Sequence, residues 1–168
     1  MSRSLISIED LGVDGVEHLL DTADRFGEVM RRDIKKVPTL RGRSIVNLFF
    51  EPSTRTATSF ELAGKRLSAD VVNVKGSGSS VEKGESLRDT LQTLDAYAPD
   101  VIVIRHPAAG AAAFAARISD AAVVNAGDGA HQHPTQALLD LATARGALGG
   151  VEGRTVAVSY THLTLPTS

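Results

Sequence analysis

The sequence contains no cysteine among its 168 residues. This absence excludes disulfide bonds and thiolate metal sites, and it is typical of a protein that works in a reducing cytoplasm. Neither sign of charge is in excess, since 18 Lys and Arg face 20 Asp and Glu. Composition therefore indicates neither a nucleic-acid partner nor an acidic disordered tail. No apolar run reaches the length of about 18 residues that a membrane span needs, and residues 1–10 lack the pattern of a secretion signal. We predict a cytoplasmic globular protein without a membrane or nucleic-acid partner.

Several common site patterns are also absent. No Gly-Lys-Ser/Thr follows a Gly-rich turn, so there is no Walker-type phosphate loop, and no dinucleotide fingerprint opens the first helix. No Ser/His/Asp arrangement can be assigned, because the serines have no obvious base. His131 and His133 suggest a metal site, but their spacing offers no third ligand, and we expect no metal.

What the sequence does contain is an alternation of short apolar runs and amphipathic stretches. Residues 13–30 first show apolar side chains at helical spacing, after a Ser7–Asp10 pair that resembles a capping box. Strands are then predicted at Ser44–Phe50, Val71–Val74, Val101–Ile104, Ala122–Asn125 and Thr155–Val158. Helices are predicted at Thr56–Leu67, Lys83–Tyr97, Ala109–Ile118 and Pro134–Arg145. This alternation implies an α/β fold in which a parallel sheet, buried on both faces, is flanked by helices.

A cluster of hydroxyl groups around one guanidinium follows the first of these strands. The apolar run ends at Phe50, Glu51-Pro52 makes a turn, and Ser53–Thr56 then lead into a helical stretch. The first N–H groups of a helix have no intrahelical partner and lie at the positive end of the macrodipole. Hydroxyl donors and a forked Arg at that end make a receptor for a phosphate-like dianion.

Polar side chains follow the other strands as well. In an open parallel sheet, ligands bind beyond the carboxyl ends of the strands. The groups found there are the hydroxyl- and lysine-rich segment 75–85, Arg105 with His106, and the segment 128–136 with His131, His133 and Gln136. Four successive strand ends thus present anion- or carbonyl-binding groups. They predict one site that acts electrostatically on a phosphate compound, without a covalent intermediate.

Each of these groups also has a purely structural interpretation. The hydroxyl groups can serve only as a helix cap, and the Gly/Ser segment can be a plain linker. Arg105 can pair with Asp100 at the surface, and His133 can cap a helix that begins at Pro134. We expect His106 to pack against its neighbours rather than to catalyse.

Four stretches of the chain resemble motifs of the aspartate/ornithine carbamoyltransferase family, in the family's order. They are Phe49–Glu61, Ser79–Thr90, Arg105-His106-Pro107 and His133–Leu141. The resemblance runs from about residue 5 to residue 157. It implies the family's N-terminal, carbamoyl-phosphate-binding domain, here at residues 1–150. Glu51-Pro52, Lys83-Gly84-Glu85 and Leu138–Leu141 favour the aspartate branch by resemblance, and the ornithine branch is the alternative.

The resemblance implies a role for each matching residue. Four would hold the phosphate: Ser53, Thr54, Arg55 and Thr56. Arg105 would bridge the phosphate and the carbonyl oxygen. Together with Thr56 and His133 it would polarise that carbonyl and stabilise the tetrahedral intermediate. Gln136 would bind the carbamoyl amino group.

The resemblance also implies a shared site and a reaction. Ser79 and Lys83 would reach the site from a neighbouring subunit, which requires a homotrimer. The α-amine of L-aspartate would attack carbamoyl phosphate and give N-carbamoyl-L-aspartate and phosphate, a step of pyrimidine synthesis. No metal or organic cofactor is implied, and regulatory or dihydroorotase subunits are possible partners.

Two departures from the family pattern limit this expectation. Ala57 stands where the family usually has Arg directly after Ser-Thr-Arg-Thr. Residues 151–157 resemble the start of the second, aspartate-binding domain, but residues 158–168 match nothing in the family and are predicted to be a non-native tail. The residues that bind aspartate in that domain are therefore missing. We expect the fragment to be inactive alone. A non-catalytic carbamoyl-phosphate-binding module is the alternative from another functional class.

Overall fold

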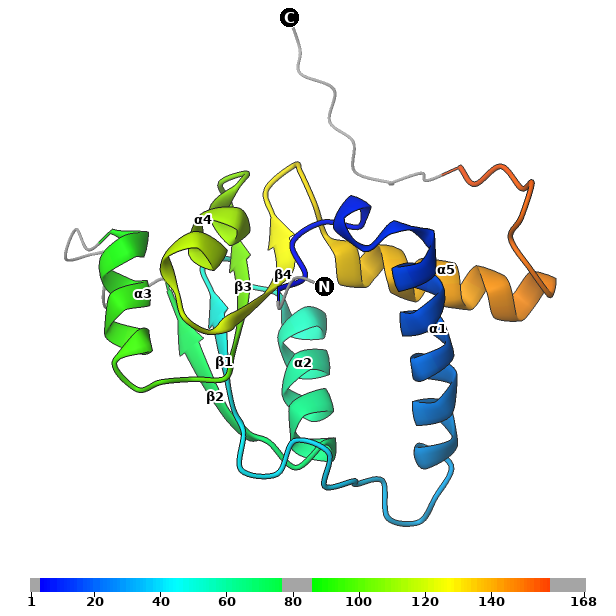
Figure 1. Ribbon diagram of the computed structural model, residues 1–168, viewed down its shortest axis with the longest axis horizontal. Helices are drawn as coiled ribbons and strands as arrows, with labels where there is room; N and C mark the ends of the chain where they lie inside the picture. Colours follow the sequence, from blue (N-terminus) through cyan, green and yellow to red (C-terminus); the bar gives the residue numbers. More distant parts are fainter. Residues whose placement is uncertain (1–3, 77–85, 158–168) are drawn as a thin grey trace, which may run out of the picture.

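The computed structural model describes residues 4–76 and 86–157. In it the first four of the five predicted apolar runs form strands. The strands are β1 (Ser44–Phe49), β2 (Asp70–Lys75), β3 (Val101–His106) and β4 (Ala122–Asp128). The helices are α1 (Gly12–Val29), α2 (Thr54–Arg66), α3 (Leu87–Asp95), α4 (Ala111–Ile118) and α5 (Pro134–Leu148). Neighbouring strands are parallel, in the order β2-β1-β3-β4 (Figure 1). This arrangement confirms the predicted parallel sheet flanked by helices.

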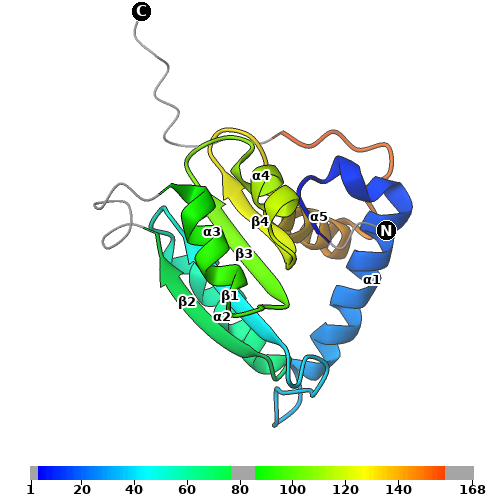
Figure 2. The same cartoon turned by 60° about the vertical axis from the view of Figure 1, so that its left-hand side comes forward.

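The alternation of side chains along the strands divides the core into two layers. On one face of the sheet, Leu48 belongs to a cluster that includes Leu91 of α3. On the other face, Phe49 and Val103 belong to a cluster packed against Phe60 of α2. Figure 2 shows α3 and α4 on one side of the sheet and α2 and α5 on the other. Arg105, two residues after Val103, therefore starts on the side of α2 and α5.

The N-terminal segment extends the sheet beside β4. Leu5 forms a parallel bridge with Val124, and its N–H donates to Val123 O at 2.8 Å. The predicted capping box is confirmed, since Ser7 N donates to Asp10 Oδ2 and Asp10 N donates to Ser7 Oγ, both at 3.2 Å. It leads into a short 3-10 turn at Glu9–Leu11 that precedes α1.

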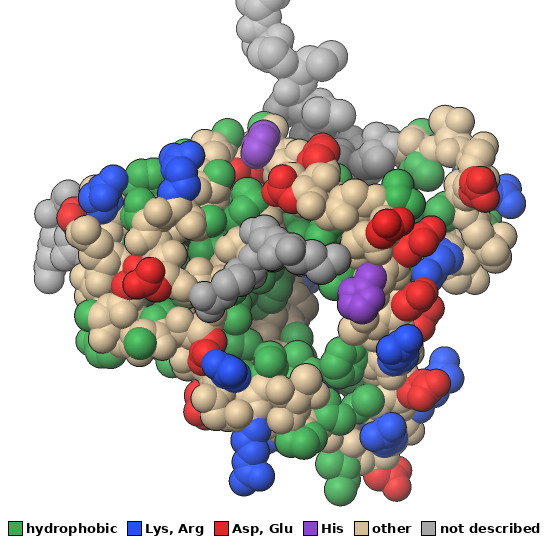
Figure 3. Space-filling model, viewed as in Figure 1, with side chains coloured by type: hydrophobic (Ala, Val, Ile, Leu, Met, Phe, Trp, Pro, Cys, Tyr) green, Lys and Arg blue, Asp and Glu red, His purple; other side chains and the backbone are tan. Residues whose placement is uncertain are grey.

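Ion pairs join α1 to α5 at the surface. The guanidinium of Arg145 contacts Asp21 at 3.1 Å and Asp24 at 2.5 Å. Acidic and basic side chains are mixed along the α1 side of the molecule (Figure 3). Within the described ranges, no helix combines the length and the apolar composition needed to cross a bilayer.

Two predicted strands differ from the structure. The β2 strand is not buried on both faces, and Val72 is 53% exposed. Among the described strands, β2 is the outermost and pairs with β1 alone. The strand predicted at Thr155–Val158 does not form over residues 155–157, which are exposed and unpaired within the described chain. Val158 lies outside the described residues. An extended segment becomes a strand only where a neighbouring backbone satisfies its N–H and C=O groups.

The third predicted helix also begins later than expected. Ser86 is the N-cap of α3, because its Oγ accepts from Asp89 N at 3.3 Å while the Asp89 carboxylate accepts from Ser86 N at 3.0 Å. This reciprocal pair sets the first helical residue at Leu87 rather than at Lys83. Residues 83–85 lie outside the described ranges.

Candidate active site

The carboxyl ends of the strands lie along one edge of the sheet because all the strands are parallel. The strand register pairs Phe49 with Arg105 and His106 with Asp128. The segments that follow β1, β3 and β4 therefore start side by side. One consequence is an ion pair between the end of β3 and the segment after β1, in which Arg105 Nε lies 3.6 Å from Glu51 Oε2.

Ser53–Thr56 lie at the N-terminus of α2, as predicted. Ser53 is the N-cap residue, and its carbonyl accepts the first helical hydrogen bond from Ala57 N at 3.0 Å. Its side chain makes no capping hydrogen bond, so the hydroxyl group is not used to hold the helix. Arg55 is exposed, and its guanidinium makes no ion pair within residues 4–76 and 86–157. The capping role considered for these hydroxyl groups is therefore not observed at Ser53.

Two cavities open near this edge. One, of about 560 Å³, lies beside the start of α2 and is lined by Ser53 and Thr54. The other, of about 770 Å³, is lined by Arg105, His133 and Gln136. Glu51 lines both cavities, which makes them neighbours.

The predicted site residues are therefore brought together in two groups. Arg105, His133 and Gln136 share one cavity, and Ser53 with Thr54 lines the adjoining one. Arg55 and Thr56 follow directly on α2 but are not lining residues of either cavity. Two further residues, Ser79 and Lys83, lie outside the described residues.

Arg105 is held against β4 rather than at the outer surface. Its Nη1 donates to Ala126 O at 3.0 Å, and its Nε is buried without a hydrogen-bond partner among the described residues. The alternative pairing with Asp100 does not occur, because Asp100 precedes β3 at the opposite edge of the sheet. There it accepts from Arg43 Nη1 at 2.7 Å and from Ser44 N at 2.8 Å. A buried N–H without an acceptor is costly, and Glu51 Oε2, at 3.6 Å from this Nε, is too far away for a hydrogen bond.

His133 lies near Arg105, with Gly127 between them. A Cβ at Gly127 would lie 2.8 Å from Arg105 Nη1 and 3.5 Å from His133 Cδ2. Burial lowers the pKa of His133 and the positive charge of Arg105 lowers it further, although Asp140 opposes them. The imidazole is therefore neutral at neutral pH and can donate a hydrogen bond from one ring nitrogen. Its side chain does not cap α5, which begins at Pro134.

Gln136 is the third residue of α5, and its amide nitrogen is engaged within the helix. Its Nε2 donates to Asp140 Oδ1 at 2.9 Å. Gln136 and Asp140 both line the cavity shared with Arg105 and His133, and the Gln136 side-chain oxygen makes no hydrogen bond among the described residues. An acceptor in that position suits an amino group on a ligand.

His133 has a local partner, since its Nδ1 lies 3.3 Å from Thr135 Oγ1, and so do two further histidines of this edge. The ring of His106 packs edge-on against Phe50 with centroids 4.7 Å apart, and its Nδ1 accepts from Ala108 N at 2.9 Å. The packing role expected for His106 is confirmed. His131 Nδ1 lies 3.1 Å from the buried Asp128 carboxylate. In the described ranges, no three His, Cys, Asp or Glu side chains gather as a metal ion would require.

Two residues of this edge were missed by the sequence reasoning. By sequence, Glu51 belongs to a turn and to a family motif but has no predicted role in the site, although it pairs with Arg105 and lines both cavities. Asp128 reads only as the start of a polar segment, although its side chain is 1% exposed. An acid placed directly at the end of a buried strand is the signal that could have identified Asp128.

Comparison with known proteins agrees with this geometry. Residues 3–146 match the family model described as the carbamoyl-phosphate-binding domain of aspartate/ornithine carbamoyltransferases. The chain belongs to the aspartate/ornithine carbamoyltransferase family. This chain is 60% identical over 156 residues to an aspartate carbamoyltransferase catalytic subunit of Sorangium cellulosum. It is 56% identical over 158 residues to the catalytic subunit of Pelotomaculum thermopropionicum. These alignments cover 93% and 94% of this chain but only 49% and 51% of the relatives. The chain thus spans about half the length of the relatives that it matches.

Solved structures of carbamoyltransferases show the same fold. The chain is 41% identical to an aspartate transcarbamoylase of Trypanosoma cruzi in complex with carbamoyl aspartate and phosphate, with a TM-score of 0.83. It is 43% identical to the catalytic subunit of the M. jannaschii enzyme, again with a TM-score of 0.83. The likeness covers 90% of this chain in both cases, and 47% and 49% of the solved chains.

Proposed function

We propose that this chain is the carbamoyl-phosphate-binding half of an aspartate carbamoyltransferase, which transfers the carbamoyl group of carbamoyl phosphate to L-aspartate. The observation that carries the proposal is the grouping of the buried Arg105 Nε, which has no hydrogen-bond partner among the described residues, with the neutral His133 in one cavity. That cavity adjoins the uncapped start of α2, at Ser53. A phosphate held at α2 would place an attached carbonyl toward Arg105.

The phosphate group would bind at the start of α2. The backbone N–H groups of the first turn and the positive end of the helix favour a dianion there. Ser53, Thr54 and Thr56 would add hydroxyl donors, and Arg55 would add a charge-assisted contact. Arg105 Nε lies 3.6 Å from Glu51 Oε2, so an anionic ligand would compete with Glu51 for the guanidinium.

The carbamoyl group would be activated by electrostatic stabilisation. Arg105, His133 and Thr56 would donate to the carbonyl oxygen and stabilise the negative charge that develops on it. Gln136 would accept from the carbamoyl amino group. The aspartate amine would form a bond to the carbonyl carbon, the bond between that carbon and the phosphate oxygen would break, and the departing phosphate would take up the proton that the amine loses. The products would be N-carbamoyl-L-aspartate and phosphate.

The proposal divides the chain as its resemblance to the family does. Residues 1–150 would form the carbamoyl-phosphate domain, residues 151–157 would begin the aspartate-binding domain, and residues 158–168 would be a non-native tail. The relatives are about twice as long, and their remaining half would supply the aspartate site. The relatives named above are aspartate enzymes, which supports aspartate over ornithine as the acceptor. A cytoplasmic location is part of the same proposal.

The assembly is also a proposal. Ser79 and Lys83 of one subunit would complete the site of its neighbour, in a homotrimer that regulatory or dihydroorotase subunits can join. Sedimentation velocity measures the assembly, and a chain that stays monomeric at every concentration would contradict the shared site.

Calorimetry with carbamoyl phosphate and an assay for carbamoyl-aspartate test the function together. We expect this chain to bind carbamoyl phosphate and to show no turnover, while the same chain fused to the second half of a relative transfers the group to L-aspartate and not to L-ornithine. Binding without turnover in both proteins would favour the non-catalytic module. Transfer to ornithine would place the protein in the other branch of the family.

A further inference from the structure

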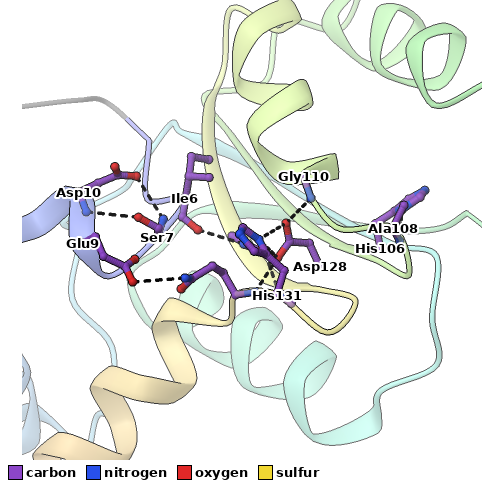
Figure 4. Close-up of polar contacts among 12 residues, drawn as sticks. Ile6, Ser7, Glu9, Asp10, His106, Ala108, Gly110, Asp128 and His131 are labelled. Carbon is purple, nitrogen blue, oxygen red and sulfur yellow. Dashed lines mark hydrogen bonds and ion pairs between the residues drawn. The ribbon is translucent and has the colours of Figure 1, made fainter. Parts of the chain in front are cut away.

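A buried carboxylate at the end of β4 has no part in the proposed reaction. The side chain of Asp128 is 1% exposed, and four groups hydrogen-bond to it: Gly110 N at 2.8 Å, Gln132 N at 2.9 Å, His131 Nδ1 at 3.1 Å and Asn125 Nδ2 at 3.2 Å (Figure 4). Burial raises the pKa of Asp128, but these hydrogen bonds outweigh burial and hold the pKa below its usual range. The carboxylate is therefore ionised at neutral pH.

This carboxylate joins three parts of the fold. Gly110 is the N-cap residue of α4, so the negative charge lies at the positive end of that helix. Asn125 lies on β4 and also donates to Ile6 O at 3.0 Å, which ties in the N-terminal segment. The third part is the loop between β4 and α5, which carries His131 and Gln132. Figure 4 shows Asp128 lying between this loop and Gly110.

The loop is fixed at the residue before His133. Gln132 N donates to Asp128 Oδ1 at 2.9 Å, and Asp128 N donates to Gln132 O at 3.2 Å. Both backbone groups of Gln132 are thus held by Asp128. Gly129 N also donates to His106 O at 2.9 Å, which ties the loop to the end of β3. His133 follows directly, and α5 with Gln136 begins one residue later.

We propose that Asp128 is a positioning residue for the carbonyl end of the site. Its carboxylate holds the β4–α5 loop so that His133 and Gln136 meet a carbonyl that Arg105 binds. Arg105 is anchored separately, on Ala126 O, so a loop that moves would separate His133 from Arg105. The inference rests on the proposed function, because it assigns His133 and Gln136 to the carbamoyl group.

The positioning role requires a carboxylate at position 128. A carboxylate only accepts hydrogen bonds, and here every partner that reaches it donates. In Asp128→Asn the new NH2 group must face either Gly110 N and His131 Nδ1 or Gln132 N and Asn125 Nδ2. One of these donors then loses its acceptor, and the loop can no longer be held on both sides. The change keeps the size of the side chain, so it tests the hydrogen bonds and not the packing.

Two ligands separate the phosphate end of the site from the carbonyl end. Methylphosphonate presents only the phosphate-like group, whereas phosphonoacetamide adds the carboxamide that stands in for the carbamoyl group. In the wild-type chain, calorimetry should show tighter binding of phosphonoacetamide. In Asp128→Asn that preference should fall about 10- to 100-fold, the range found when residues that orient metal-binding side chains are changed, while the affinity for methylphosphonate stays within about twofold.

Asp100→Asn is the matched control. Asp100 also accepts several hydrogen bonds that lower its pKa, from Ser44 and Arg43, but it lies at the opposite edge of the sheet. Asp100→Asn should lower the stability of the protein and leave the preference between the two ligands unchanged. An equal loss of affinity for both ligands in Asp128→Asn, or no loss, would overturn the positioning role.

A second variant covers the case in which Asp128→Asn does not fold. Asp128→Glu keeps the charge and moves the carboxylate by one methylene, so it should reduce the preference for phosphonoacetamide and leave methylphosphonate binding intact. A preference equal to that of the wild type would overturn the inference. Failure of the proposed function gives a different result, because the wild-type chain itself would then show no preference for phosphonoacetamide.

Discussion

At the scale of single residues, Arg55 and Arg105 are held in different ways. Arg105 is anchored on Ala126 O, whereas Arg55 is exposed and makes no ion pair within the described residues. Arg55→Ala should therefore change the free energy of unfolding by less than about 0.5 kcal/mol. It should lower the affinity for carbamoyl phosphate about tenfold or more, because a hydrogen bond to a charged group contributes about 1.5–3 kcal/mol. Urea unfolding and calorimetry measure the two effects.

Arg66→Ala is the control for this change. It removes the same charge from the other end of α2, about 16 Å along the helix axis. If Arg66→Ala and Arg55→Ala weaken carbamoyl phosphate binding equally, the phosphate does not bind at the start of α2.

His133 gives a prediction about pH at the same scale. Burial and the charge of Arg105 lower its pKa in the folded protein, so the unfolded chain takes up the proton first as the pH falls through about 6.5. Folding is therefore favoured most above this pH and becomes less favourable below it. Burial lowers the pKa of His106 as well. His106 therefore still contributes to the pH dependence of stability when His133 is replaced. His133→Gln should thus lose less stability than the wild type between about pH 7.5 and pH 5.5.

Urea unfolding at the two pH values measures this difference. His18→Gln, which removes an exposed imidazole on α1, controls for the loss of a histidine as such. A fall in stability as steep in His133→Gln as in the wild type would show that His133 does not take up its proton on unfolding in this range.

At the scale of elements, the loop between β4 and α5 depends on a glycine. Gly129 has a φ of +66°, and a Cβ there would collide with Pro107 O. Gly149, the C-cap residue of α5, has a similar φ of +70° but nothing within 4 Å of its Cβ position. Gly149→Ala should cost about 1 kcal/mol of unfolding free energy from backbone strain alone. Gly129→Ala should cost about 1–3 kcal/mol more, because the loop must also move. Chemical denaturation of both variants measures the difference, and equal losses would mean that the collision relaxes without cost.

The elements differ in how far the sequence determines them. The succession of strands and helices along the chain could be predicted, because each apolar run and each helical period is a local signal. The exposure of Val72 and the missing strand at 155–157 could not, because both depend on which backbone lies alongside. The same limit applies to the site. Ser53–Thr56 follow a strand and begin a helix, which is local, whereas the Arg105–Glu51 pair arises from the pairing of β1 with β3.

At the scale of the whole molecule, α5 is more exposed than its apolar composition leads one to expect. Pro134 is its only buried residue, and Leu139 and Leu148 are 59% and 51% exposed. The apolar side chains of α5 lie on more than one side of the helix, and large apolar side chains gathered at a surface are typical of a contact with another part of a protein. Since the relatives are about twice as long as this chain, we expect their second half to cover this surface in a full-length protein.

This expectation can be tested with one substitution in two proteins. In the 168-residue chain, Leu139→Ser should change the free energy of unfolding by less than about 0.5 kcal/mol, because the side chain is already in water. In the chain fused to the second half of a relative, the same change should cost about 1–3 kcal/mol, because it places a hydroxyl in an apolar contact. Leu91→Ala is the control, since Leu91 is fully buried and its truncation should cost about 2–5 kcal/mol in both proteins. If Leu139→Ser is equally mild in both, the second half packs elsewhere, and the aspartate site would have to reach the Arg105 cavity without crossing α5.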